Sequence, residues 1–237
     1  MDLTYRSTDL EIMDDLECSG EVVNQTLREL EFINRWLGGN QVTLQAVREL
    51  LESRKSKDSG SVSIVDLGCG GGDMLKHIAD LGRRLDIPLK LLGIDANPNI
   101  IAFAKQNCTE YPEIIFETAN VLSEDFASRS YDIMIGTLFF HHFDDSTLIT
   151  LLSQLRKQVR VGIVINDIHR HFLAYHSIRL LTHLFSSSSM VRFDAPLSVR
   201  RAFKRNEWEK LLARAGATKS IIRWKWAFRW QIQVLAE

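Results

Sequence analysis

A glycine-rich turn follows a short apolar run in the first half of the chain, where Ile64 and Val65 lead into Asp66. The glycines of the turn are Gly68, Gly70, Gly71 and Gly72. Because glycine has no Cβ atom, a ligand can lie directly against such a backbone. A helix predicted over residues 74–81 places its free N–H groups just past the turn. The stretch therefore predicts a ligand-binding turn between a buried strand and a helix.

Two adjacent histidines, His141 and His142, follow the apolar run at residues 131–137. Histidine accepts a proton near neutral pH without a large pKa shift, so it suits general-base chemistry. If residues 63–66 and 131–137 are the first and fourth strands of a parallel sheet, their carboxyl ends flank the crevice where the strand order reverses and ligands bind. The pair is therefore a candidate for active-site lining, whereas a lone histidine is usually structural.

The elements that must position these residues alternate along the chain. Strands are predicted at residues 63–66, 89–95, 114–118, 131–137, 159–166, 221–226 and 229–235. Helices are predicted at residues 21–37, 44–53, 74–81, 100–106, 146–157, 172–184 and 206–215. Such alternation is typical of an α/β protein with a mostly parallel sheet. Residues 1–15 are expected to form a loose or partner-dependent tail, and residues 190–202 a connecting segment.

The pattern D-x-G-x-G-x-G that starts at Asp66 resembles motif I of the class I S-adenosylmethionine (SAM)-dependent methyltransferases. The near alternative is a dinucleotide-binding turn, G-x-G-x-x-G. A second mark favours the methyltransferases, because Asp95 ends the second predicted strand 29 residues after Asp66. A carboxylate there can accept both ribose hydroxyls of an adenosine. The resemblance covers about residues 60–165 well.

The resemblance implies a Rossmann-like, seven-stranded sheet, mostly parallel with the last strand antiparallel, and helices on both faces. It also implies an N-terminal tail and helical cap at residues 1–58, and a methyltransferase domain at residues 59–237. The domain would carry a helical lid insert after the fifth strand, at about residues 172–204. One departure is that Gln158 and Val159 stand where the family has a Pro-Gly-Gly turn before the fifth strand.

The implied cofactor is SAM. The family places an acid on the adenine amino group where this chain has Asn120, whose amide oxygen can accept the same hydrogen bond. The residues expected to contact SAM are Asp66, Gly68, Cys69, Gly70, Gly72, Asp95, Ala96, Asn120, Val121 and Thr137.

The run from His141 to Asp144 and Asp145 resembles the branch that acts on quinones, sterols and similar small molecules. In the family the end of the fifth strand faces the methyl group, which adds further candidate bases. His142 is the first choice for a base, and the orienting or alternative groups are His141, Asp167 and His169. His171 follows the same strand and is a further candidate base. The expected reaction is O-methylation of a phenolic, quinone-like or polyketide acceptor. The alternatives are a SAM-binding module without turnover and, less favoured, an RNA methyltransferase.

The net charge of −1 is unevenly divided. Residues 1–154 hold 13 basic and 25 acidic side chains, and residues 155–237 hold 16 and 5. The two parts either neutralise each other across one fold, or the basic part faces an anionic partner. The basic residues in and after the insert are Arg179, Arg192, Arg200, Arg201, Lys204 and Arg205. They would suit an acidic acceptor, or anionic lipid headgroups in a peripheral membrane contact.

Three cysteines, Cys18, Cys69 and Cys108, show no metal-ligand spacing. Together with the polar N-terminus and the lack of an apolar run of about 18 residues, they indicate a cytoplasmic protein without a metal site. No nucleic-acid partner is expected. The acceptor and the oligomeric state are left open by the sequence.

Overall fold

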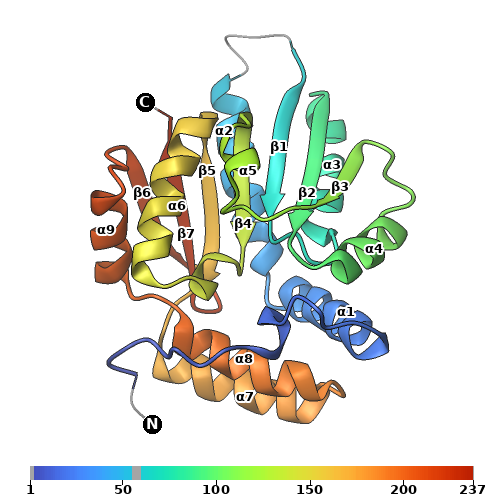
Figure 1. Cartoon of the computed structure of the whole chain (residues 1–237), viewed down its shortest axis with the longest axis vertical. Helices are drawn as coiled ribbons and strands as arrows, with labels where there is room; N and C mark the ends of the chain where they lie inside the picture. The colour runs from blue at the N-terminus through green and yellow to red at the C-terminus, as the bar shows by residue number, and fades with distance from the viewer. Residues whose placement is uncertain (1–2, 55–59, 237) are drawn as a thin grey trace.

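The computed structural model describes residues 3–54 and 60–236, so the expected domain boundary at residues 58–59 lies outside the described residues. Its centre is a seven-stranded sheet with the order β3-β2-β1-β4-β5-β7-β6 (Figure 1). The strands are β1 Val62–Leu67, β2 Leu89–Asp95, β3 Ile114–Thr118, β4 Tyr131–Thr137, β5 Val159–Ile168, β6 Ser220–Lys225 and β7 Arg229–Leu235. β1 to β5 pair in parallel, and β7 runs antiparallel between β5 and β6. The fold expected from the sequence is confirmed.

Helices cover both faces of the sheet. Those of the described chain are α1 Glu21–Trp36, α2 Gly39–Arg54, α3 Asp73–Leu85, α4 Pro98–Asn107, α5 Glu124–Ala127, α6 Asp145–Gln158, α7 Phe172–Phe185, α8 Ser189–Arg201 and α9 Arg205–Arg214. Two short 3-10 helices are η1 Ile12–Asp14 and η2 Phe140–His142. None of the described helices is long and apolar enough to cross a membrane.

Successive residues of the central strands pack into two different cores, because side chains alternate between the faces of a strand. In β1, Val65 and Leu67 join a cluster with α6 and α9, whereas Val62 and Ile64 join one with α2, α3 and α4. This explains why the run reads as continuously apolar. Both cores support the same end of the sheet, where the glycine turn leaves β1.

Three sequence expectations about elements are wrong. Helix α2 begins at Gly39, five residues before the expected start. The connection expected at residues 190–202 is helix α8, which packs against α7 to form a helical hairpin. Residues 3–15, expected to belong to a loose or partner-dependent tail, include η1, which contacts α8. Figure 1 shows this segment, α1, α7 and α8 together beyond the carboxyl ends of the strands.

Candidate active site

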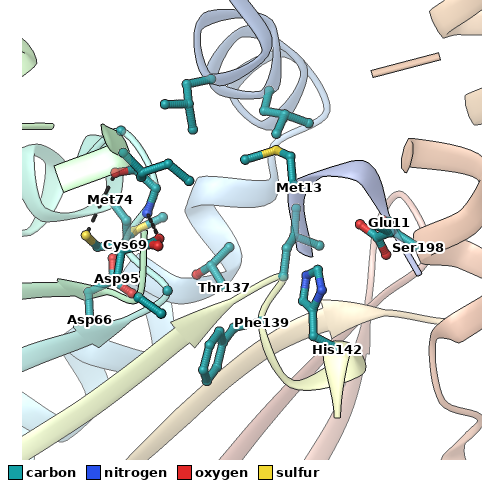
Figure 2. A pocket seen from close by; sticks show the side chains of 18 of the residues that line it. Glu11, Met13, Asp66, Cys69, Met74, Asp95, Thr137, Phe139, His142 and Ser198 are labelled. Atoms are coloured by element: carbon teal, nitrogen blue, oxygen red, sulfur yellow. Dashed lines mark hydrogen bonds between the residues drawn. The ribbon is translucent and has the colours of Figure 1, made fainter. Parts of the chain in front are cut away.

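A cavity of about 370 Å³ lies where the carboxyl ends of β1, β2 and β4 meet η1, α1 and α8 (Figure 2). Its floor includes the glycine turn and the residues after β4. Its other walls come from the N-terminal segment, α1 and α8. This is the crevice at which the strand order of an open parallel sheet reverses, the usual position for a ligand. Its volume falls within the usual range of small-molecule sites.

The glycine turn forms the part of the cavity next to β1. Gly68 and Gly70 have φ values of +67° and +51° and line the cavity together with Cys69. A Cβ atom on Gly68 would overlap the ring of Phe139. Gly72, expected to contact the cofactor, is instead the left-handed N-cap of α3, packed against Phe116 and outside the cavity lining. Glycine is therefore needed at position 72 because a Cβ atom would overlap the Phe116 ring.

Asp66 and Asp95 lie under and beside the turn (Figure 2). Asp66 is 2% exposed, and its Oδ1 has no hydrogen-bond partner among the described residues. Burial, followed by the nearby Asp95, raises the pKa of Asp66 well above its usual range. Asp95 accepts hydrogen bonds from the backbone N–H groups of Gly70 at 3.4 Å and Asn97 at 3.0 Å. Burial also raises the pKa of Asp95.

The remaining residues expected at the cofactor all line the same cavity: Ala96, Asn120, Val121 and Thr137. The Asn120 side-chain oxygen accepts the Leu122 N–H at 2.9 Å, which fixes the turn after β3. An amide oxygen has two lone pairs, so one acceptor position is still available. The Thr137 hydroxyl lies 3.0 Å from the Thr43 hydroxyl of α2.

His141 and Asp167 form a buried pair at the other end of the cavity. The His141 ring Nδ1 lies 2.7 Å from Asp167 Oδ1, and its backbone N–H donates to Oδ2 at 3.1 Å. Both side chains are about 1% exposed. Burial disfavours a charge on His141, but Asp167 and Glu11 outweigh it and raise the pKa of His141 to about 9. Asp167 itself is outside the cavity lining and contacts His141, which lines it.

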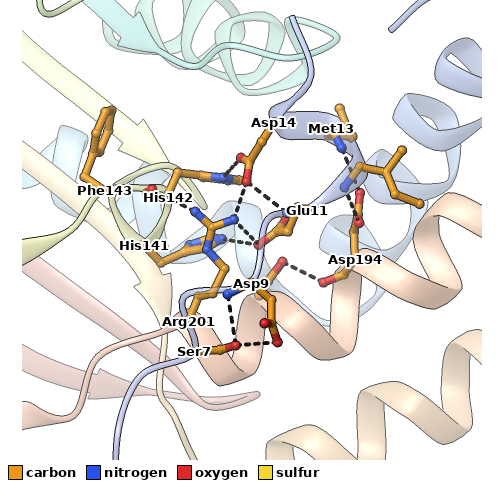
Figure 3. A network of polar contacts seen from close by, with 12 residues as sticks. Ser7, Asp9, Glu11, Met13, Asp14, His141, His142, Phe143, Asp194 and Arg201 are labelled. Atoms are coloured by element: carbon orange, nitrogen blue, oxygen red, sulfur yellow. Dashed lines mark hydrogen bonds and ion pairs between the residues drawn. The ribbon is translucent and has the colours of Figure 1, made fainter.

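His142, the first choice for a base, stacks on His141 with ring centroids 4.4 Å apart and also lines the cavity. Its Nδ1 lies 2.6 Å from Asp14 Oδ1 (Figure 3). Asp14 also accepts a hydrogen bond from Arg201 of α8. Burial would raise the pKa of Asp14, but His142 and Arg201 outweigh it and hold that pKa well below its usual range.

His169 is not part of the cavity, which corrects the expectation that it is a base near the methyl group. Its backbone N–H donates to the Phe228 carbonyl at 2.8 Å, and its ring packs on the Trp230 ring with the two centroids 4.7 Å apart. Burial, then nearby positive groups, lowers the pKa of His169 to about 4. His171 lies beside it at 5.4 Å, also outside the cavity. Contacts with β7 and its turn thus separate this pair from His141.

The N-terminal segment contributes cavity residues that sequence reasoning missed: Glu11, Met13, Asp14 and Leu16. The sequence feature that could have located this segment is the uneven charge, because its acidic residues pair with basic residues of the C-terminal part. Arg201 contacts Asp14 and lies 3.7 Å from Glu11, while Arg200 lies 3.1 Å from Asp9. None of the described cavity-lining residues is Lys or Arg, so the basic insert does not present its charge to this cavity.

The sheet order, the glycine turn and the acid that ends β2 define a class I methyltransferase fold. Residues 64–162 match the family model described as "Methyltransferase domain". A stretch of 115 residues is 27% identical to the non-reducing polyketide synthase atr1 of Stereocaulon alpinum, covering 47% of this chain and 4% of that protein.

Two solved structures share the fold at 17% identity. The plantazolicin methyltransferase BpumL, in complex with S-adenosylhomocysteine (SAH), has a TM-score of 0.64, with 91% of this chain and 94% of that chain covered. The citrinin polyketide synthase CMeT domain has a TM-score of 0.59, with 79% and 50% covered. The match over residues 64–162 and the shared fold bear out the resemblance to SAM-dependent methyltransferases that the glycine turn predicted.

Proposed function

We propose that SAM lies over the glycine turn, with its ribose at Asp95 and its adenine beside Asn120 and Val121. The buried, unpartnered Oδ1 of Asp66 supports this placement, because a hydrogen-bond donor or a positive charge of the ligand would satisfy it. SAM carries both, in its amino group and its sulfonium. Gly68, Cys69 and Gly70 leave room for its chain against the backbone.

We propose further that the acceptor is a neutral, enolisable compound of the polyketide type, and that the methyl group is transferred to its acidic carbon. The observation that carries this is the buried His141–Asp167 pair at the acceptor end of the cavity. Asp167 holds the ring by Nδ1 and directs Nε2 to the acceptor. There the neutral form of His141 removes the acidic hydrogen from carbon. The similarity to a polyketide synthase and to a CMeT domain supports a carbon acceptor.

The reaction then balances simply. The acceptor loses a proton to the neutral form of His141, and its carbanion attacks the methyl carbon of SAM. The new carbon–carbon bond forms as the bond from sulfur to the methyl group breaks, and SAH leaves with a neutral thioether sulfur. The chain's main contribution is the alignment of the two reactants. A phenol is the second candidate acceptor, because a phenolic oxygen needs the same loss of a proton at His141. Since acids and apolar groups line the cavity, an RNA backbone is disfavoured.

Product analysis tests the proposal. The protein is incubated with SAM carrying a deuterated methyl group and, in turn, a 1,3-dicarbonyl thioester or a resorcinol. Mass spectrometry and NMR then locate the label on carbon or oxygen. His141→Asn should lower kcat by about 10²–10⁴-fold and leave SAH affinity within about 2-fold. The matched control, His169→Ala, should keep its turnover, because His169 lies outside the cavity.

The outcomes separate the candidate functions. Label on oxygen alone would replace the carbon acceptor by the phenolic one. SAH binding without transfer to either acceptor would favour a non-catalytic module. Full turnover in His141→Asn would remove His141 from the mechanism.

A further inference from the structure

Three side chains with metal-binding atoms meet at the acceptor end of the cavity: Glu11, His141 and His142. One potential ligand atom from each lies within 4.8 Å of the other two. Glu11 comes from the N-terminal segment, 130 positions before His141, so no sequence spacing reveals the group. Figure 3 shows Glu11 between the two histidines and α8.

Both histidines are oriented as metal-binding histidines usually are. Asp167 holds His141 by Nδ1 at 2.7 Å, and Asp14 holds His142 by Nδ1 at 2.6 Å. Because a carboxylate accepts a hydrogen bond from Nδ1–H, the neutral form of each ring has its lone pair on Nε2. A carboxylate behind a metal-bound imidazole fixes the ring and raises its basicity in this way.

Two buried atoms of the group have no hydrogen-bond partner in the described part of the chain, although they lie within ion-pair distance of each other. Neither Glu11 Oε1 nor His141 Nε2 has a hydrogen bond within the described residues, and the two lie 3.6 Å apart. Both side chains are more than nine-tenths buried. Leaving a buried carboxylate oxygen unsatisfied costs free energy. A cation between these atoms would satisfy both.

The local charge also suits a divalent cation. The carboxylates of Glu11, Asp14 and Asp167 lie against the two imidazoles. Arg201, which contacts Asp14 and lies 3.7 Å from Glu11, supplies one positive charge. Carboxylates therefore outnumber guanidinium groups around these ligand atoms, which favours a cation here.

We propose that Glu11, His141 and His142 bind a divalent first-row transition metal ion such as Zn²⁺. Two imidazoles and a carboxylate are a donor set that these ions accept, and three protein ligands leave an open position. The open position faces the cavity, where an ion would bind the acceptor's oxygen and lower its pKa. An ion on His141 Nε2 would keep that nitrogen from taking the acceptor's proton, so the ion-bound chain and the chain with His141 as base are alternative states. Ion binding does not rest on the proposed function, because it is measured without an acceptor.

The test uses the full chain after removal of metals with a chelator. Zn²⁺ is titrated by calorimetry, and Co²⁺ is titrated by its visible absorption, which reports coordination by nitrogen and oxygen ligands. One ion should bind per chain. Glu11→Gln and His142→Ala should each weaken binding at least 10-fold. The matched controls Glu17→Gln and His169→Ala should bind as the unchanged chain does.

Titration with SAH checks that each variant is folded and keeps its cofactor site. The absence of one-to-one binding in the unchanged chain would overturn the proposal. Equal affinity in Glu11→Gln, His142→Ala and the two controls would also overturn it, because the ion would then lie elsewhere. If Glu11→Gln fails to bind SAH, its metal affinity is disregarded and the metal affinity of His142→Ala alone tests the proposal. Metal binding without label on any acceptor would leave this inference standing and reject the proposed function.

Discussion

Gly68 and Gly70 lie two positions apart in the turn but have different steric surroundings. A Cβ atom on Gly68 would overlap the Phe139 ring, whereas on Gly70 the nearest atom would be Leu27 Cδ2 at 3.6 Å. Both residues have positive φ, so alanine at either adds strain of about 1–2 kcal/mol. Overpacking at Gly68 adds about 1–3 kcal/mol more.

We therefore expect Gly68→Ala to melt about 2–12 °C below Gly70→Ala in the absence of ligand. Thermal unfolding followed by circular dichroism measures the difference. The comparison is made without SAH, because a Cβ atom at either position also faces the cavity. Equal melting temperatures would show that the Phe139 ring moves aside at little cost.

The sequence predicted the residues whose positions follow from local structure. Asp66, Gly68 and Asp95 lie at the ends of adjacent strands, so a β–turn–α pattern alone places them on one edge of the sheet. Glu11 and Asp14 could not be placed in this way. They reach the cavity through contacts with Arg201 and the two histidines, more than 120 positions away. Such contacts depend on tertiary packing, which cannot be predicted from the spacing of apolar residues along the sequence.

At the scale of elements, Arg6 is one of several residues that hold the N-terminal segment in place. Its guanidinium donates to the carbonyls of His141 and Phe143, each at 2.9 Å, and to the Arg201 carbonyl at 2.6 Å. It also lies over the Phe203 ring at 3.7 Å. One side chain thus connects the segment to both η2 and α8.

Arg6→Ala should release this segment and destabilise the chain by about 2 kcal/mol, since it removes several hydrogen bonds to buried carbonyls. That corresponds to a melting temperature lower by about 4–8 °C. Limited proteolysis should cut the variant within the first 20 residues sooner than the unchanged chain. Arg28→Ala, which removes an exposed ion pair with Glu21, is the control and should change neither result. An unchanged cleavage pattern in Arg6→Ala would mean that other contacts hold the segment.

Helix α8 shows why an element can be missed from the sequence. It packs on α7 and η1 and also lines the cavity, so its apolar residues are not confined to one stripe. Pro196 lies inside it, and proline usually ends a helix. Its N-cap, Ser188, accepts the Val191 N–H at 3.3 Å and is the one local signal of its start. Tertiary contacts therefore stabilise α8 as a helix although its sequence has only a weak helical preference.

At the scale of the whole molecule, the cavity lies at the carboxyl ends of the strands, and a second polar group lies at their amino ends. There Asp132 accepts hydrogen bonds from the Ser63 N–H and hydroxyl at 2.8 Å and from Arg160 at 3.0 Å. These contacts join β1, β4 and β5 where the strands begin. The alternation of strands and helices predicted this sheet correctly, because chain order and the right-handed crossover restrict how parallel strands assemble.

Asp132 should make the stability of the sheet depend on pH. Burial would raise its pKa, but Arg160 and Ser63 outweigh it and lower the pKa to about 2. A carboxyl group with a lowered pKa in the folded state stabilises the fold above its unfolded pKa of about 3.9, and this stabilisation is lost as the pH falls towards 2. Asp132→Asn should therefore be less stable at pH 7 by about 1.5–3 kcal/mol.

Urea unfolding at several pH values measures this difference. The gap in unfolding free energy between the unchanged chain and Asp132→Asn should stay constant from pH 7 to about pH 5 and narrow below about pH 4. Glu110→Gln, which changes an exposed carboxylate, should show a small gap throughout. A gap for Asp132→Asn that stays constant down to pH 3 would mean that its hydrogen bonds stabilise the fold equally when the carboxyl group is protonated. Because Asp132 lies at the edge of the sheet opposite the cavity, SAH affinity at pH 7 should be unchanged, so acid stability and cofactor binding can be altered separately.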